Sequence, residues 1–190
     1  MRLIIITHSE FISDEAAKIN ALFKAGMEIL HIRKLKSYKK DCVALLEEID
    51  QQYHPQIKIH DFFDLADHYP VLGVHLNCRN PVYRGSRKLN ISKSCHTIEE
   101  LNHIDEYDYV FLSPIFNSIS KPCYTKKFTE EVLQKACKEG KINNKVIALG
   151  GINADTLPLL KEYTWGGAAV LGSIWKTEDV VSNFLKLKKI

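Results

Sequence analysis

Short apolar runs alternate along the chain with longer stretches that have helical spacing. The runs are four to six residues long and cover 3–7, 29–33, 57–60, 71–76, 88–92, 109–113, 146–150 and 168–172. They are rich in Ile, Val and Leu with little polar alternation, which is typical of parallel strands buried on both faces. The pattern therefore predicts eight strands of a parallel sheet.

The stretches between the runs are amphipathic, and several carry signals for helix ends. Ser13 precedes two acidic residues and is the predicted N-cap of the first helix, which Gly26 should end. Thr97 and Glu100 have the spacing of a capping box. A last helix is predicted to close the chain in a Lys-rich turn.

Strands alternating with helices predict a single α/β domain over residues 1–190, a small (β/α)8 TIM barrel. This fold typically takes ~250 residues, so a chain of 190 is short for it. Segment 77–87 contains Pro81 and Gly85 and leaves no room for a full helix. We therefore expect the fourth helix to be missing or reduced to a turn. An open doubly wound sheet is the alternative.

Composition narrows the classes of partner. The 26 Lys and Arg against 23 Asp and Glu give a net charge of +3 without long blocks of one sign, which argues against nucleic acid. No apolar run approaches the ~20 residues that cross a bilayer, and the first run is too short for a signal peptide. We expect no membrane partner and a cytoplasmic protein. The five cysteines lack CxxC spacing and should be free thiols.

Polar and small residues follow the predicted strands at their C-terminal ends, where (β/α)8 barrels carry their active sites. Two glycine corners stand out, Gly150-Gly151 and Gly172-Ser173. Glycine lets backbone N–H groups approach an anion, and barrels often bind phosphate after their last two strands. The two corners therefore predict a phosphate site.

Other polar residues at these ends have two explanations each. Arg33 either pairs with a carboxylate or meets an anionic ligand, and Asp61 either binds Mg²⁺ or caps a helix. His75 is either a satisfied wall residue or part of the site. His96 precedes a predicted helix start, which disfavours imidazolium, and is either a neutral general base or a surface residue. Lys121 is either a phosphate ligand or a solvated lysine.

Six motifs follow one another in order along the chain. They are His-Ile-Arg-Lys at 31–34, His-Asp-Phe-Phe-Asp-Leu-Ala at 60–66, Gly-Val-His-Leu at 73–76, Ser-Cys-His-Thr-Ile-Glu-Glu-Leu at 94–101, Asp-Tyr-Val-Phe-Leu-Ser-Pro-Ile-Phe-Asn-Ser-Ile-Ser-Lys at 108–121 and Ile-Ala-Leu-Gly-Gly-Ile at 147–152. Over nearly its whole length the chain thus resembles the thiamin-phosphate synthase and TenI superfamily. The resemblance implies a small (β/α)8 barrel in thiamin biosynthesis.

That resemblance implies one of two activities. Synthases of the superfamily join a pyrimidine diphosphate to thiazole phosphate with Mg²⁺ and release pyrophosphate. TenI-type members aromatise a thiazole phosphate precursor by proton transfer and need neither diphosphate nor metal. A phosphorylated thiazole is the expected ligand in both cases, and the pyrimidine diphosphate only in the first.

On the thiazole-phosphate side, the family pattern is kept. Two serines stand where the family has Thr-x-Thr, a lysine follows them, and a glycine follows the seventh strand. After the eighth strand, two residues stand where the family offers backbone N–H groups, although glycine replaces the usual serine. The implied substrate-binding residues are Ser118, Ser120, Lys121, Gly151, Leu171 and Gly172.

On the diphosphate side, the pattern erodes. Arg33 and Ser94 are kept, but His31 replaces a typical Gln and His60 replaces an Asn. Leu35 falls where a diphosphate-binding Lys is expected, which leaves its neighbours Lys34 and Lys36 as candidates to compensate.

The implied Mg²⁺ ligands are also incomplete. Asp61 keeps one ligand, whereas Asn80 replaces the second. An amide in place of a carboxylate should weaken a site for this hard cation. His31 and His96 stand where TenI-type relatives carry histidines, His96 at the position of their proton-transfer residue.

The sequence narrowly favours a TenI-like thiazole tautomerase with His96 as general base and acid and no cofactor. The alternative is a thiamin-phosphate synthase in which Asp61 and Asn80 hold Mg²⁺. A barrel that binds a ligand without turnover is the third hypothesis. The oligomeric state, a homo-oligomer included, stays open.

Overall fold

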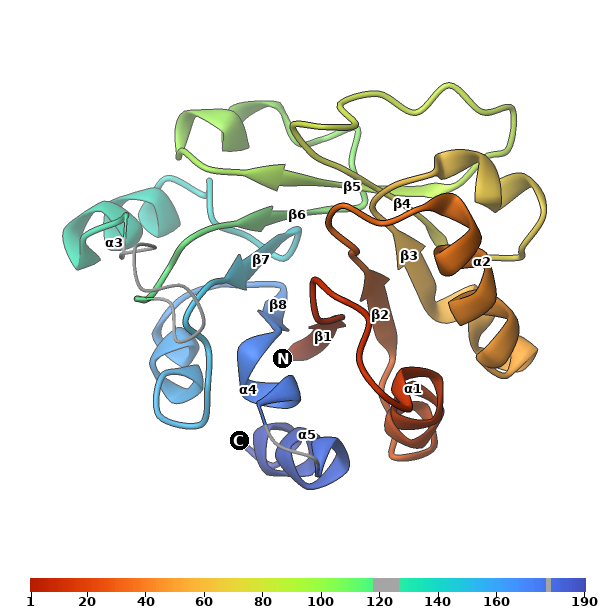
Figure 1. The fold of residues 1–190 in the computed structure, drawn as a ribbon. Helices are drawn as coiled ribbons and strands as arrows, with labels where there is room; N and C mark the ends of the chain where they lie inside the picture. The colour runs from red at the N-terminus through yellow and green to blue at the C-terminus, as the bar shows by residue number, and fades with distance from the viewer. Residues whose placement is uncertain (118–126, 177–178) are drawn as a thin grey trace.

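Eight parallel strands form a closed barrel in which each strand pairs with its neighbours in chain order (Figure 1). The computed structural model describes residues 1–117, 127–176 and 179–190. The strands are β1 (Arg2–Ile6), β2 (Ile29–Ile32), β3 (Ile57–Ile59), β4 (Gly73–Leu76), β5 (Asn90–Cys95), β6 (Tyr109–Leu112), β7 (Val146–Leu149) and β8 (Gly167–Val170). β1 pairs with β8 and closes the barrel. The predicted barrel is confirmed, and the open doubly wound sheet is excluded.

Strand β5 differs most from its predicted bounds. It runs on to Cys95, whereas the apolar run ends at residue 92. Ser92 and Ser94 alternate with Ile91 and Cys95 along the strand, and both serines bond to His75 in the barrel interior. A strand with polar residues on its inner face has no continuous apolar run, so the apolar pattern predicts a strand that ends too early.

The barrel is small because much of its helical layer is reduced. Segment 77–89 between β4 and β5 has no helix, as predicted. The connections after β3, β5 and β7 are also short, a reduction that the sequence did not predict. They contain only the 3₁₀ turns η2 (Phe63–Asp67), η3 (Glu99–His103) and η4 (Leu157–Glu162); a further turn, η1 (Gln51–Gln56), precedes β3. The α-helices are α1 (Glu15–Lys24), α2 (Lys39–Glu48), α3 (Glu130–Lys138), α4 (Gly172–Trp175) and α5 (Val180–Lys188).

The ends of α1 correct one prediction and confirm another. Asp14, not Ser13, precedes the helix, and its side chain makes no capping hydrogen bond. Gly26 ends the helix as predicted: its φ is +92°, and its N–H bonds to Phe23 while that of Met27 bonds to Leu22. These two bonds form a Schellman motif, which requires a left-handed residue.

A capping interaction also starts η3, as the Thr97–Glu100 spacing predicts. The Glu100 N–H donates to Thr97 Oγ1 at 3.3 Å. The Glu100 carboxylate accepts from the His96 N–H at 2.6 Å, one residue earlier than in the standard box. This second bond fixes the backbone of His96.

Two apolar layers stabilise the barrel. One lies between the strands and the outer elements, and the other fills part of the barrel interior with Ile4, Ile6, Tyr109, Phe111, Ile147 and Ala169. These interior residues come from β1, β6, β7 and β8, whereas β2 to β5 contribute buried His31, Lys58, His75 and Ser92. The interior is thus divided into an apolar half and a polar half. Among the described helices, none has the length and apolarity to span a bilayer.

Candidate active site

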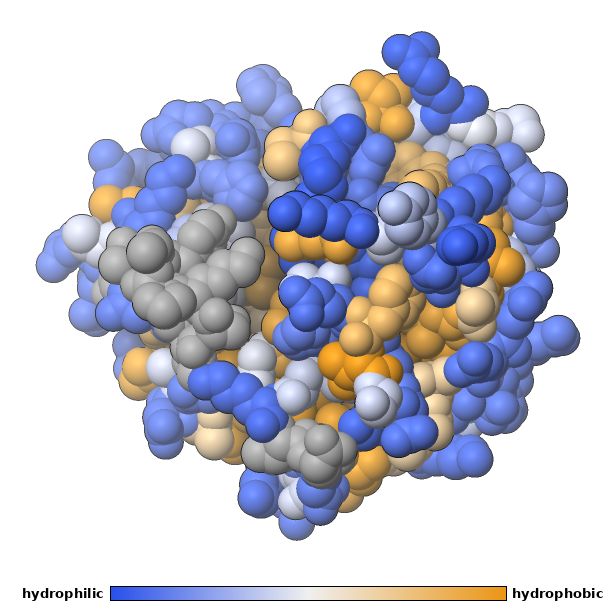
Figure 2. All heavy atoms as spheres, viewed as in Figure 1, coloured by the Kyte–Doolittle hydropathy of each residue, from blue (hydrophilic) through white to orange (hydrophobic). Residues whose placement is uncertain are grey.

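A cavity of about 300 Å³ opens at the C-terminal ends of the strands. Polar and apolar side chains mix around this mouth of the barrel (Figure 2). Strands β1 and β6 to β8 supply the apolar part of its floor, which consists of Ile6, Phe111, Leu149 and Ala169. The polar part consists of His60, which follows β3, and Ser94 of β5. The rim is formed by Arg33, Asn77, Cys78, Arg79, His96, Ser113, Gly150, Gly151, Ile152, Val170, Leu171, Gly172 and Ser173.

Both predicted glycine corners face this one cavity. Gly150 and Gly151 have φ values of +103° and +68°, a region that favours glycine. A methyl group on Gly151 would collide with the carbonyl oxygen of Asn117, so the corner also needs glycine for space. At the other corner, Gly172 and Ser173 begin α4, where backbone N–H groups have no intrahelical acceptor.

Ser173, which the sequence predicts as part of this corner, also brings its side chain to the cavity. Its Oγ is buried and has no hydrogen-bond partner within the described part of the chain. A buried hydroxyl without a partner costs free energy, and Ser173 borders the cavity. An anion held by the two corners would supply the missing partner.

His96 lies at the rim with its ring oriented by β6. Its Nδ1 is 3.2 Å from the carbonyl oxygen of Ser113, which can only accept a hydrogen bond, and 3.3 Å from the Ser113 hydroxyl, which can donate or accept. In the tautomer that donates from Nδ1 to the carbonyl, Nε2 keeps its lone pair. An imidazole with this tautomer can take a proton from a ligand in the cavity.

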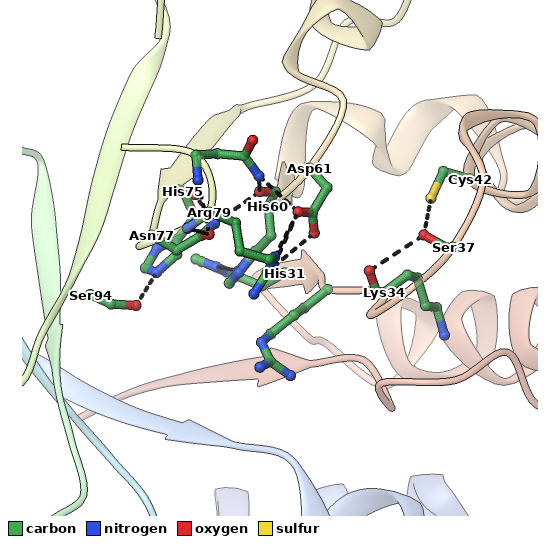
Figure 3. A network of polar contacts seen from close by, with 12 residues as sticks. His31, Lys34, Ser37, Cys42, His60, Asp61, His75, Asn77, Arg79 and Ser94 are labelled. Carbon is green, nitrogen blue, oxygen red and sulfur yellow. Dashed lines mark hydrogen bonds and ion pairs between the residues drawn. The ribbon is translucent and has the colours of Figure 1, made fainter. Parts of the chain in front are cut away.

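Below the rim, three histidines from neighbouring strands fill the polar half of the interior (Figure 3). His31 Nδ1 lies 2.9 Å from His60 Nε2, and His31 Nε2 lies 2.6 Å from the hydroxyl of Tyr109. His75 lies between two serines, with Nδ1 2.9 Å from Ser92 Oγ and Nε2 2.8 Å from Ser94 Oγ. Since a neutral imidazole has one donor and one acceptor, both nitrogens of His31 and of His75 are satisfied.

All three histidines are neutral. Burial lowers the pKa of His31, His60 and His75 well below the usual value, and mutual repulsion with neighbouring cationic groups lowers it further. Of the two explanations for His75, the satisfied wall residue holds.

The histidine cluster is held by hydrogen bonds and ring contacts and is not a metal centre. The three residues are close enough to suggest one, with ligand atoms within 4.8 Å of one another. However, the rings of His60 and His75 stack at 4.2 Å with an interplanar angle of 24°. An imidazole binds a metal in its ring plane, and two nearly parallel planes do not meet at a shared ion.

The two proposed Mg²⁺ ligands bond to each other. Asp61 is also paired with Arg79 (Figure 3). Asp61 Oδ1 accepts from Asn80 Nδ2 at 2.8 Å, and Arg79 Nη2 lies 3.1 Å from both Asp61 oxygens. Asn80 Nδ2 also donates to the His60 carbonyl at 3.0 Å. Asn80 therefore presents nitrogen to Asp61, and these residues as arranged do not fit Mg²⁺, which takes oxygen ligands. Asp61 also caps no helix, because η2 follows Phe62.

Lys34 cannot replace the missing diphosphate-binding lysine. Its Nζ is buried and lies 2.5 Å and 2.6 Å from the two oxygens of Glu15, on the side of the strand away from the cavity. It also donates to the carbonyls of His8 and Glu10. Lys36 has a left-handed φ of +54° and does not line the cavity.

The cavity brings together most, but not all, of the residues singled out from the sequence. Arg33, His60, Ser94, His96, Gly151, Leu171 and Gly172 line it. His31 lies behind His60, while Asp61 and Asn80 lie beside the rim without lining it. Ser118, Ser120 and Lys121 lie outside the described residues.

Arg79 and Ser113 line the cavity but were not predicted as site residues. Arg79 follows β4, which carries the candidate site residue His75, so the sequence could have predicted this charged residue as part of the site. Nothing in the sequence indicates that Ser113 orients His96.

Known proteins resemble the chain over most of its length. The sequence model of the family described as thiamine monophosphate synthase matches residues 3–174. A thiamine-phosphate synthase of Lysinibacillus sphaericus is 29% identical over 187 residues, which cover 88% of this chain and 85% of that protein.

Two solved structures extend the comparison. The crystal structure of thiamine phosphate pyrophosphorylase from Bacteroides thetaiotaomicron is 39% identical, with a TM-score of 0.89, over 100% of this chain and 96% of that one. Thiamine phosphate pyrophosphorylase from Pyrococcus furiosus, 20% identical, has a TM-score of 0.80 over 99% and 94% of the two chains. The second comparison bears on the fold alone.

Fold, cavity and relatives together define an enzyme of thiamin biosynthesis built on a closed parallel barrel. The chain belongs to the thiamine monophosphate synthase family, the thiamin-phosphate synthase and TenI superfamily. The predicted family is therefore confirmed, and so is the prediction of an enzyme.

Proposed function

We propose that this enzyme is a thiazole tautomerase of the TenI type. The observation that carries the proposal is that His96 lines the cavity with Nδ1 held by Ser113, an arrangement in which Nε2 can serve as the base. The erosion of the metal side supports it, because Asp61 and Asn80 bond to each other rather than offering two oxygens to an ion.

In this mechanism, the substrate phosphate lies between the two glycine corners. Backbone N–H groups at Gly151 and Gly172 and the hydroxyl of Ser173 donate to its oxygens. This anchor brings the thiazole ring over the floor of Phe111 and Ala169. The ring and His96 then meet in a fixed geometry, which supplies much of the rate.

Proton transfer needs only this chain's own groups. His96 Nε2 takes a proton from one carbon of the precursor, and the same nitrogen returns it to another carbon, so that the ring becomes aromatic. No electrons are gained or lost overall. The Ser113 carbonyl stabilises the imidazolium intermediate through its hydrogen bond to Nδ1–H.

A His96→Gln variant tests the mechanism. Gln retains a polar side chain at the rim but cannot act as a base, and we expect kcat to fall ~10²–10⁴-fold with little change in KM. The assay follows aromatisation of the thiazole phosphate precursor by absorbance. His103→Gln, which changes an exposed histidine of η3, is the matched control and should leave kcat unchanged. A His96→Gln enzyme as fast as wild type rules out this mechanism.

The second candidate is thiamin-phosphate synthase, which the names of the relatives favour. Arg33 and Ser94 would then contact the diphosphate of the pyrimidine substrate, with Mg²⁺ required as the resemblance implies. The test is pyrophosphate release from the pyrimidine diphosphate and thiazole phosphate in the presence of Mg²⁺. Release at a rate that exceeds aromatisation would replace our proposal with this one.

A further inference from the structure

Arg79 is held on Asp61 by a rigid turn. The backbones of Asn77 and Asn80 exchange hydrogen bonds of 3.1 Å and 3.0 Å, and the Arg79 N–H donates to Asn77 Oδ1 at 3.0 Å. The Asn77 side chain in turn donates to the carbonyls of His60 and His75. These bonds fix the turn to the ends of β3 and β4, which places the Arg79 guanidinium beside Asp61.

Both oxygens of the Asp61 carboxylate are thereby engaged. Arg79 Nη2 bridges its two oxygens, Nε adds a third contact at 3.3 Å, and Asn80 Nδ2 takes Oδ1 as well. Asn80 meets these oxygens with Nδ2, because reversing the amide would set its oxygen against the oxygens of Asp61 and His60. A divalent ion would have to displace the guanidinium and reverse the amide.

Arg79 itself lines the cavity, and its side chain is 41% exposed. Guanidinium has five N–H donors, and the contacts with Asp61 use only those on Nε and Nη2. The donors on Nη1 are not used in these contacts. Together, Arg33, Arg79 and Asp61 give this side of the site a net charge of +1.

We propose that Arg79 is the fixed cation of the cavity: its guanidinium occupies the carboxylate that Mg²⁺ would need, and the enzyme binds an anionic group of its ligand there without a divalent ion. This inference rests on the proposed function only in that the ligand is anionic. It assigns to Arg79 the charge neutralisation that a synthase is expected to obtain from a metal.

Titration calorimetry with Mg²⁺ alone tests whether Arg79 keeps Mg²⁺ from Asp61. Wild type should show no saturable heat up to ~10 mM Mg²⁺, a range that covers weak sites with few protein ligands. The double variant Arg79→Ala/Asn80→Asp frees Asp61 and restores a second carboxylate, so it should gain saturable Mg²⁺ binding. Asp61→Asn in that background should abolish the gain. Saturable binding of Mg²⁺ to wild type that Asp61→Asn removes overturns the proposal.

Binding of inorganic pyrophosphate in EDTA tests whether an anionic group binds at Arg79 without a divalent ion. Wild type should bind it, and Mg²⁺ should not tighten binding. Arg79→Ala should weaken it by about tenfold or more, as expected for a lost charge-assisted contact. Arg84→Ala, an exposed arginine in the same segment, is the control. Absence of binding in EDTA, or equal affinity of wild type and Arg79→Ala, overturns the proposal. None of these measurements uses turnover, so they can fail while the tautomerase activity stands, and the reverse.

Discussion

Lys58 lies inside the barrel, and we expect its replacement to stabilise the protein. Its side chain is fully buried on β3, and Nζ has no hydrogen-bond partner among the residues that the structure describes. Burial lowers its pKa from 10.5 to about 7, with the charge of Asp108 opposing the shift. The ring of Tyr109, 4.3 Å from Nζ, attracts the cation but does not restore its lost hydration.

The size of the effect follows from linkage. Each pKa unit corresponds to about 1.4 kcal/mol, so the fall to about 7 means that keeping Lys58 in the folded protein costs about 4 kcal/mol at pH 7. The folded pKa lies below the unfolded one, so the unfolded chain binds the extra proton between pH 7 and 10.5. The cost therefore shrinks as the pH rises through this window, to about 1 kcal/mol at pH 9.5.

Urea unfolding of wild type and Lys58→Met at pH 7 and pH 9.5 measures this cost. Met keeps the length of the side chain and removes the amine, so the variant should be more stable by about 4 kcal/mol at pH 7 and by less at pH 9.5. Lys88→Met, in an exposed loop, should change stability by no more than about 0.5 kcal/mol. A Lys58→Met variant that is no more stable than wild type, or whose advantage does not depend on pH, would refute the reasoning.

Two further predictions concern buried charges. The lowered pKa values of His31, His60 and His75 mean that the unfolded chain protonates first as the pH falls below ~6.5, so stability should drop by up to about 4 kcal/mol per pH unit there. Unfolding at pH 7, 6 and 5 checks this, and a pH-independent stability contradicts it. Glu15→Gln leaves Lys34 buried without its carboxylate and should cost about 3–5 kcal/mol in urea unfolding; a loss below ~1 kcal/mol would show that the pair is not needed to hold Lys34.

The strand pattern was predictable because seven strands are formed mainly by apolar residues, and β2, β3 and β4 each contain only one buried polar residue. The end of β5 was not predictable, because its inner face carries Ser92 and Ser94, whose partner is His75 on the neighbouring strand. The loss of helix between β4 and β5 could be predicted from Pro81 and Gly85. The 3₁₀ turns after β3, β5 and β7 could not, because short amphipathic segments have the same spacing in a 3₁₀ turn as at the start of an α-helix.

The site was predictable where backbone geometry decides it and not where side chains choose their partners. Gly150 and Gly151 are needed for their positive φ values, and a glycine pair after a strand indicates such a corner. Lys34 follows β2 and Asp61 follows β3, both at the C-terminal end of the barrel. Lys34 pairs with Glu15, whereas Asp61 pairs with Arg79. Sequence spacing alone does not tell which partner each charge will meet.

The division of the barrel interior explains why the polar half persists despite its cost. We expect Lys58 to weaken the fold at neutral pH and the three histidines to weaken it only at lower pH. β1 and β6 to β8 fill the rest of the interior with apolar side chains. The cavity lies over both halves. Its glycine corners stand above the apolar floor, where a low dielectric strengthens N–H bonds to an anion. The arginines stand above the histidines. The backbone carbonyls of His60 and His75 accept from the Asn77 side chain, which holds the turn that carries Arg79 at the ends of β3 and β4. The polar half of the interior therefore lowers the stability of the fold and at the same time underlies the cationic side of the site.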